Sequence, residues 1–387
     1  MSPEKSYPLS TKKKILFFAV LYSMLILTGI FAVSLELILL RSKVIYDYYK
    51  TRAVIVENRV YQYDPELGSA PIPGSQTKNL YPDGYTVPIR FDQNGFRVPL
   101  NTPESNALNH PSMLVLGCSY SFGLGCPAEK TYPYLVGQQL KMNSLNAAYP
   151  GYGLAQMLIL AKRLIPKYKP DFVLVQFSPW LADRPQNPIS PWSYIGTSPF
   201  FIKSNDGKLT IHPPVFKPKI SELNILNYHY TPKSTADYLS FMKNVGIPFY
   251  ISDGANLAVY YFKRLFGIIP KQVNKSEEIV DFVYEEIERL CEENHAQMVI
   301  VIITDPGTWR KPSPAEIEKL KSIPNTIIVN TEPALLNALP VKTKSAYDSA
   351  YRIWHGSPPV CIDIHPNETA HQIIAAQIIQ TIKNTTC

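Results

Sequence analysis

The chain has 387 residues, of which 45% are hydrophobic, and a formal net charge of +7. These values are ordinary for a globular protein and exclude disordered and collagen-like classes. Basic residues cluster only near the N-terminus, at Lys5 and Lys12–Lys14, and elsewhere they alternate with acidic residues. Because no basic helix or patch with interleaved aromatics occurs, we expect no nucleic-acid partner.

An uncharged apolar run spans residues 15–35 and is long enough to cross a hydrocarbon core as one helix. The lysines that precede it favour a cytoplasmic N-terminus. Residues 1–44 are therefore predicted to be a cytoplasmic tail and a single-pass anchor in the cell membrane, with the C-terminal domain extracytoplasmic. A cleaved secretory signal is the alternative, and it would export the domain as well.

Residues 45–107 are polar and rich in turns, and they are predicted to form a small lead-in that contains β-strands. The dipeptide Asn94-Gly95 lies between apolar residues, which is typical of a hairpin turn in which both central residues have positive φ.

Residues 108–387 have the alternating pattern of an α/β domain. Short apolar strands are predicted at 113–117, 145–149, 171–178, 297–304 and 326–330, and helices at 129–141, 153–168, 275–296, 313–323 and 367–383. Nearly continuous apolar strands that alternate with helices indicate a parallel sheet covered on both faces. The predicted fold class is therefore α/β, a three-layer doubly wound parallel sheet, and such sheets carry their chemistry at the carboxyl ends of the strands.

Residues 179–274 interrupt this alternation and are too long for a bare loop. We interpret them as an insertion that lies over the active face, with a hairpin at Asp206-Gly207. The apolar segment 255–270 is too short to span a membrane and is expected to pack inside the insertion; contact with a bilayer surface is the alternative.

Two segments far apart in the sequence hold the candidate catalytic residues. Ser119 follows the first strand directly, where a tight turn between glycines can expose its hydroxyl; a helix N-cap is the alternative. His365 precedes the last helix, and Asp363 can accept a hydrogen bond from its Nδ1, which leaves Nε2 to take a serine proton. The alternative is a capping loop in which Asn367 caps the helix and His365 only packs.

Three segments, LVLGCSYSFGLG (114–125), NAAYPGYGLAQ (146–156) and DIHPNETAH (363–371), resemble in this order the conserved stretches of the SGNH/GDSL hydrolases. The resemblance covers residues 60–180 and 275–385. It implies a flavodoxin-like sheet and a serine esterase with Ser119 as nucleophile, Asp363 and His365 as its acid and base, and the amides of Ser119 and Gly151 as oxyanion donors.

Two positions depart from the pattern of that family. Cys118 replaces the Asp that precedes the nucleophile, and Cys118 is itself an alternative nucleophile, although no visible neighbour would lower its pKa. In that family a further conserved stretch, after the strand that corresponds to 171–178, carries an Asn whose amide donates to the oxyanion; no Asn stands at the matching place here, and the loss of one such donor costs on the order of 100- to 1000-fold in rate. Ser178 and Arg184 are candidates to replace it, and Trp180 either packs or stacks on a sugar.

We expect from this a serine ester hydrolase outside the cytoplasmic membrane that acts on O-acylated glycans or lipids. No phosphate-binding, dinucleotide-binding or zinc motif occurs, and the five cysteines form no C-x-x-C pair, so no cofactor or metal is expected. The expected partners are an ester substrate, for which an acylated carbohydrate is a candidate, and the membrane through the N-terminal helix. Two alternatives stay open: an O-acyltransferase of a cell-surface polysaccharide with a covered cleft, and a catalytically degenerate binding or assembly module.

Overall fold

The computed structural model describes most of the chain. The described residues are 10–50, 54–55, 60–81, 84–103, 110–186, 197–204, 206–217, 236, 243, 256, 258–269, 273, 275–305 and 312–386, without the side chains of 30, 32–50, 54–55 and 386.

A five-stranded parallel sheet forms the centre of the molecule, as predicted. It consists of β7 (Ser112–Leu116), β8 (Asn143–Asn146), β9 (Phe172–Phe177), β12 (Gln297–Ile302) and β13 (Thr326–Asn330). The strand order is β13-β12-β9-β7-β8, and all neighbouring pairs are parallel. Numbered along the chain this order is 2-1-3-4-5, which is doubly wound with its switch point between β7 and β9.

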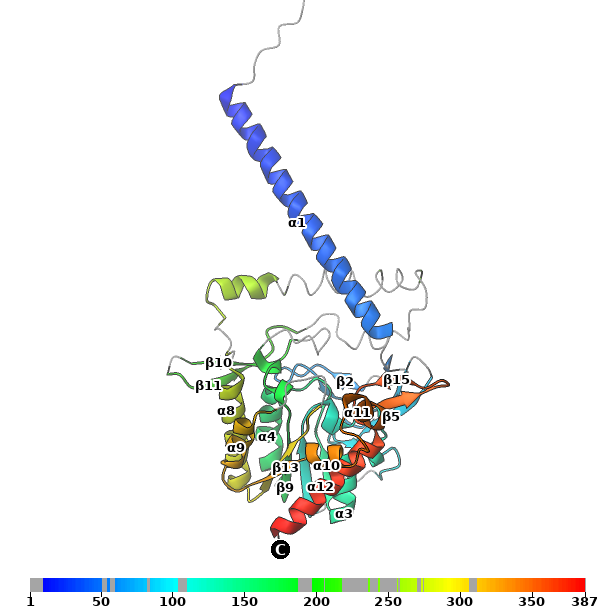
Figure 1. Cartoon of the computed structure of the whole chain (residues 1–387). Helices are drawn as coiled ribbons and strands as arrows, with labels where there is room; N and C mark the ends of the chain where they lie inside the picture. Colours follow the sequence, from blue (N-terminus) through cyan, green and yellow to red (C-terminus); the bar gives the residue numbers. More distant parts are fainter. Residues whose placement is uncertain are drawn as a thin grey trace, which may run out of the picture.

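Helices lie on both sides of this sheet (Figure 1). On one side α4 (Leu154–Tyr168) packs against α8 (Ser276–Glu293), and on the other α3 (Tyr132–Leu140) packs against α12 (Glu368–Thr386). The apolar stripe of α8 explains its orientation, since its buried residues recur at helical spacing: Ile279, Val283, Ile287 and Leu290. The predicted α/β architecture is therefore confirmed.

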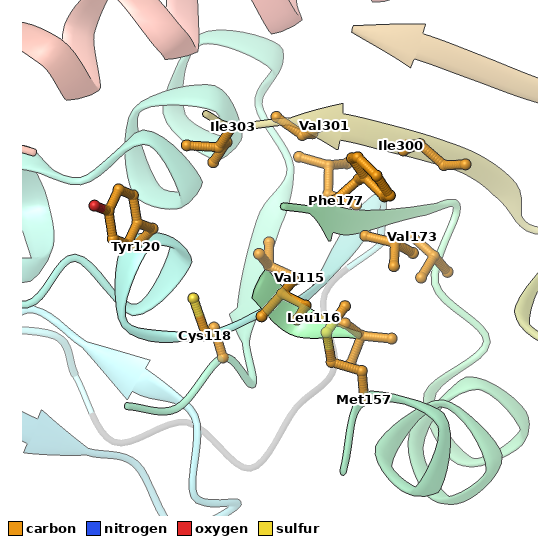
Figure 2. Packing of buried hydrophobic residues seen from close by; sticks show 14 of the residues in the cluster. Val115, Leu116, Cys118, Tyr120, Met157, Val173, Phe177, Ile300, Val301 and Ile303 are labelled. Carbon is orange, nitrogen blue, oxygen red and sulfur yellow. The ribbon is translucent and has the colours of Figure 1, made fainter. Parts of the chain in front are cut away.

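The three central strands of the sheet, β7, β9 and β12, are buried on both faces. All five residues of β7 are buried, and β12 is buried from Met298 to its end. Figure 2 shows side chains of β7, β9 and β12 packed together, with Cys118 and Tyr120 at the edge of the same cluster. This double burial explains why the strands have continuous apolar sequences and no alternation.

The last part of the chain contains short elements that the sequence pattern did not predict. α9 (Pro314–Lys321) was expected, whereas α10 (Glu332–Asn337), α11 (Lys344–Tyr351) and the hairpin of β14 (Ile353–His355) and β15 (Val360–Asp363) were not. Asp363, one of the candidate site residues, is the last residue of this hairpin.

The N-terminal part contains a small antiparallel sheet, here called the small sheet, in the order β1-β4-β5-β6. Its strands are β1 (Val54–Ile55), β4 (Gln76–Leu80), β5 (Thr86–Phe91) and β6 (Arg97–Val98), and a separate pair joins β2 (Tyr61–Gln62) to β3 (Ala70–Pro71). The β-content of the lead-in thus agrees with expectation, while its boundary with the α/β domain stays a prediction.

The turn between β5 and β6 differs from the expected one. Gly95 has a φ of 84°, but Asn94 is not among the residues with positive φ. The carboxylate of Asp92 accepts hydrogen bonds from the amides of Asn94 and Phe96 and thereby stabilises a wider loop.

The insertion is described in part. β10 (Phe200–Lys203) and β11 (Leu209–His212) form the expected hairpin, with Gly207 at a φ of 82°. In the apolar segment, Tyr260 is buried, but Phe262 and Leu265 are exposed, contrary to the expected interior packing. Much of the remainder of 179–274 lies outside the described residues, so its placement over the active face stays a prediction.

The predicted membrane anchor is contradicted. Residues 11–50 form one helix, α1 (Thr11–Lys50). Within the described part of the chain, no helix combines the length and apolar character required to cross a membrane. The predicted single-pass location is therefore wrong, and the membrane partner that depended on this anchor is not supported.

Candidate active site

Ser119 is the first residue of α2 (Ser119–Phe122), a single helical turn that directly follows β7 at the switch point of the sheet. Gly123 ends this turn in the left-handed region, with a φ of 78°. A Cβ at Gly123 would lie 2.1 Å from Cγ2 of Thr131, so only glycine fits here. The short turn keeps Ser119 at the carboxyl end of the sheet.

The structure brings Ser119, His365 and Asp363 together across 246 residues of sequence. The distance from Ser119 Oγ to His365 Nε2 is 2.9 Å, and the distance from His365 Nδ1 to Asp363 Oδ1 is 2.6 Å. The backbone N–H of His365 also donates to Asp363 Oδ1, at 3.0 Å. With Nδ1–H directed at the carboxylate, Nε2 is the acceptor for the serine hydroxyl.

Asp363 is held as an anion in a buried position. Burial alone raises the pKa of Asp363, but the charge of His365 and the hydrogen bonds from His365 and Tyr81 outweigh it and leave the pKa below its ordinary value. A carboxylate that stays charged in this place can orient the imidazole and stabilise its protonated form.

Gln176 in β9 joins the nucleophile turn to the neighbouring strand. Its Oε1 accepts from the amide of Cys118 at 3.0 Å and from Ser121 Oγ at 2.7 Å. Its Nε2 donates to Ser178 Oγ at 2.8 Å and contacts Cys118 Sγ at 3.3 Å. A Cβ at Gly117 would lie 2.4 Å from Ser121 Oγ, so the glycine allows this close approach. Cys118 is fully buried in this packing, which favours Ser119 over Cys118 as the nucleophile.

The candidate oxyanion donors have different surroundings. Gly151 lies in the loop after β8 with a φ of 87°, and the role of its amide stays a prediction. The hydroxyl of Ser178 donates to the carbonyl of Ile303 at 2.6 Å, so Ser178 would have to give up that bond to serve an oxyanion. Arg184 donates to the carbonyl of Tyr152 and thereby braces the loop that carries Gly151.

Trp180 is connected to His365 by two successive aromatic contacts. It belongs to a short 3₁₀ helix after β9, Pro179–Leu181, and its ring centroid is 5.2 Å from that of Tyr120. The Tyr120 ring is in turn 5.2 Å from the ring of His365. Trp180 is only partly buried, so its ring can contribute to a surface beside the reacting atoms.

The loop that carries His365 is anchored by a buried ion pair. Arg352 donates to the carbonyl of Ile364 and pairs with Asp305, which lies just beyond β12. Asp305 also accepts from the hydroxyl of Tyr120 at 3.3 Å. The residues on either side of the Ser119–His365 bond are thus linked through one buried network.

Sequence reasoning missed Gln176, Tyr81, Arg352 and Asp305. Gln176 did leave a signal, because it is a polar residue inside an apolar strand whose side chain has to find partners. Tyr81, Arg352 and Asp305 left no local signal, since their partners are distant in sequence.

Among the described residues, no three His, Cys, Asp or Glu side chains are grouped to hold a metal ion. The described cysteines, Cys118, Cys126, Cys291 and Cys361, are free thiols, and Cys387 lies outside the described residues.

No family model and no curated protein matches the chain. Solved structures do match. One is a catalytic mutant of an acetylxylan esterase from Geobacillus stearothermophilus, 12% identical with a TM-score of 0.34, covering 72% of this chain and 96% of its own. The psychrotrophic esterase EstA from Pseudoalteromonas sp. is 11% identical with a TM-score of 0.35, covering 71% and 98%. A GDSL-like lipase from Bacteroides thetaiotaomicron is 10% identical with a TM-score of 0.33, covering 72% and 92%.

These neighbours are esterases and lipases, the type of hydrolase that the sequence resemblance predicts. All three TM-scores lie below 0.5, so the chemistry of this chain has to be derived from the geometry of its own site.

Proposed function

We propose that the chain is a serine ester hydrolase of the SGNH/GDSL type, with Ser119 as nucleophile, His365 as general base and Asp363 as the orienting carboxylate. One observation carries the proposal: a continuous hydrogen-bonded line runs from Ser119 Oγ through His365 to Asp363, with contacts of 2.9 and 2.6 Å. These distances lie within the reach that nucleophile, base and orienting group need.

In the proposed reaction, Ser119 Oγ attacks the ester carbonyl carbon while His365 Nε2 takes the hydroxyl proton. The backbone amides of Ser119 and Gly151 are the proposed donors to the tetrahedral oxyanion. His365 returns its proton to the leaving alkoxide, which leaves an acyl group on Ser119. Water, deprotonated by His365, then attacks the acyl carbon; the bond to Ser119 Oγ breaks, His365 returns the proton to Ser119 Oγ, and the acid is released.

O-acylated carbohydrates or lipids are the proposed substrates. The partly buried ring of Trp180, packed on Tyr120 beside His365, favours a carbohydrate as the acylated substrate. Flat aromatic surfaces suit the apolar faces of sugar rings, which a bound glycan would present next to the ester.

The test measures hydrolysis of p-nitrophenyl acetate and of an acetylated sugar by the wild type, by Ser119→Ala and by Cys118→Ala. Ser119→Ala should lower kcat by on the order of 1000-fold or more, because removal of the nucleophile leaves only the other contributions to catalysis. Cys118→Ala should keep most of the activity. Turnover that survives in Ser119→Ala but disappears in Cys118→Ala would contradict the proposal in favour of a thiol nucleophile.

Transfer of the acyl group to a sugar hydroxyl is the second candidate. Ser119 and His365 are only 6% and 9% exposed, and this shielding of the reacting atoms from water favours an acceptor that binds in the site. Adding a sugar acceptor and measuring acylated sugar against free acid separates the two reactions. A degenerate module would show neither product, and Ser119→Ala would behave like the wild type.

A further inference from the structure

The second carboxylate oxygen of Asp363 is bound by a tyrosine from another part of the chain. The hydroxyl of Tyr81, which immediately follows β4 of the small sheet, donates to Asp363 Oδ2 at 2.8 Å across 282 residues of sequence. Tyr81 is 1% exposed. Its hydroxyl therefore lies inside the protein and is directed at a catalytic carboxylate that the α/β sheet does not itself satisfy.

The hydrogen bonds to Asp363 divide its two oxygens between two partners. Oδ1 accepts both bonds from His365, and in the described part of the chain Oδ2 accepts its bond from Tyr81. Removing a donor from a largely buried carboxylate destabilises its charged form, because little water is at hand to replace the lost hydrogen bond. Burial and the nearby charge of Asp363 raise the pKa of Tyr81, so the tyrosine remains a protonated donor.

Tyr81 is itself firmly placed. Its backbone N–H donates to the carbonyl of Tyr85 at 2.9 Å, and the two rings are 5.6 Å apart. Gly125, with a φ of 86°, leaves room for the hydroxyl: a Cβ there would lie 3.2 Å from Tyr81 Oη and 2.1 Å from Cδ1 of Ile353. Because Tyr81 is held in place, its hydroxyl can fix the rotamer of Asp363, and Tyr81 cannot move with the Asp363 side chain.

The small sheet also holds the nucleophile side of the site. Arg97 in β6 is buried and donates to the carbonyls of Phe122, Gly123 and Cys126, which form the end of α2 and the loop after it. One small sheet thus contacts both the segment that follows Ser119 and the carboxylate that orients His365.

We propose that Tyr81 is a positioning residue of the hydrolase: by donating to Asp363 Oδ2 it keeps Oδ1 directed at His365 Nδ1, and the small sheet is thereby part of the catalytic apparatus. This inference rests on the proposed function of Ser119, His365 and Asp363. Tyr81 touches neither substrate nor nucleophile and acts only through Asp363.

The test is a double-mutant cycle of Tyr81→Phe with Asp363→Asn in the full chain. Tyr81→Phe alone should lower kcat by about 10- to 100-fold with little change in KM, since it removes one hydrogen bond to a buried charged group. In the Asp363→Asn background the same substitution should cost less than about threefold. A tyrosine that only supports the fold would lower activity by the same factor in both backgrounds, and that result, or full activity of Tyr81→Phe, overturns the proposal.

Tyr168→Phe is the matched control. Tyr168 is also a buried tyrosine, and its hydroxyl donates at 3.1 Å to Asn94 in the turn of the small sheet, with no contact to the triad. This variant should keep the kcat of the wild type. Thermal unfolding of both variants checks that neither is simply unfolded.

The low-field proton NMR signal of the His365 Nδ1–H provides a readout that needs no turnover. It is assigned by its absence in His365→Gln, and it should shift or broaden in Tyr81→Phe but not in Tyr168→Phe. An unchanged signal in Tyr81→Phe overturns the proposal. Ser119→Ala in the same assays separates the two failures: if it keeps the activity of the wild type, the proposed function fails, whatever Tyr81 does to the histidine.

Discussion

At the scale of single residues, Gln176 shows how an apolar strand can contain a buried polar side chain when the side chain has hydrogen-bond partners. It is fully buried in β9, and both ends of its amide have partners at the site. The two strand ends that flank the switch point are therefore tied together by one side chain. The amide of Cys118, next to the nucleophile, depends on this contact.

We expect Gln176→Leu to lower the free energy of unfolding by about 2 to 4 kcal/mol, because a leucine of similar volume leaves the Cys118 amide and the Ser121 and Ser178 hydroxyls with fewer partners. Urea denaturation measures the change. Gln139→Leu on the exposed face of α3 is the control and should stay within about 0.5 kcal/mol of the wild type. Equal stability of both variants would show that Gln176 is dispensable.

Residues of the site differ in how well sequence indicates them. Ser119, Asp363 and His365 could be predicted as candidates because each stands in a short motif at a strand or helix end; the fold brings them together, and their roles stay predictions. Tyr81 was not identifiable, because its role comes from a contact across 282 residues. The roles of Gly151, Trp180 and Arg184 stay predictions.

At the scale of elements, the loop that leads into α12 combines two roles that looked like alternatives in the sequence. Asn367 does cap the helix, since its Oδ1 accepts from the amide of Ala370 at 3.0 Å, and His365 still reaches Ser119. One turn further on, His371 is fully buried, and its Nδ1 accepts from the amide of Tyr132 at 3.3 Å. Burial, together with the charges of Arg97 and His365, lowers the pKa of His371 to about 3.

This shift predicts a loss of stability in mild acid. The pKa of His371 is about 3 in the folded chain and about 6.5 in the unfolded chain, so the unfolded state binds more protons between these values. Stability is therefore complete above about pH 6.5 and falls as the pH drops toward 3. The contribution of His371 approaches about 1.4 kcal/mol per pH unit within this window.

The measurement compares free energies of unfolding at several pH values for the wild type and His371→Asn. The variant should be less stable at neutral pH but show a flatter decline in acid, because asparagine does not titrate. His295→Asn, which changes an exposed histidine, should keep the slope of the wild type. A slope that is identical in all three proteins would refute a neutral buried His371.

Elements with long, uniform patterns were predictable, and short mixed ones were not. The strands β7, β9, β12 and β13 and the helices α4, α8 and α12 have runs of apolar residues or clear helical spacing, whereas β8 (Asn143–Asn146) has no apolar run and overlaps the strand predicted at 145–149 only in part. β14 and β15 have only a few residues each and are largely exposed, so no periodicity marks them. The apolar run at 15–35 resembled a membrane anchor, and that interpretation was wrong.

At the scale of the whole molecule, the lead-in and the α/β part are interlocked rather than joined end to end. Tyr81 and Arg97 reach from the small sheet to Asp363 and to the carbonyls after α2, and Arg163 on α4 pairs with Asp64 and Glu66 of the lead-in. The buried contacts matter more, because exposed ion pairs contribute little.

We expect a fragment of residues 108–387 to be nearly inactive and to unfold at a lower temperature than the full chain. A fragment of residues 60–387 should keep the activity and the unfolding temperature of the full chain. Without the lead-in, Asp363 Oδ2 and the carbonyls after α2 lose their donors. Esterase assays and thermal unfolding of the two fragments provide the comparison. A fully active fragment of residues 108–387 would show that the α/β part is autonomous.

The spacing of the triad also bears on the order of events when the chain folds. Asp363 and His365 are two residues apart and share a bond through the His365 backbone amide, so their contact forms within one short segment. The contact with Ser119 instead closes a loop of 246 residues, and the entropy of that closure has to be offset by the assembled sheet first. Recovery of catalysis after denaturation therefore marks the completion of the native topology, while the acid–base pair alone can exist well before it.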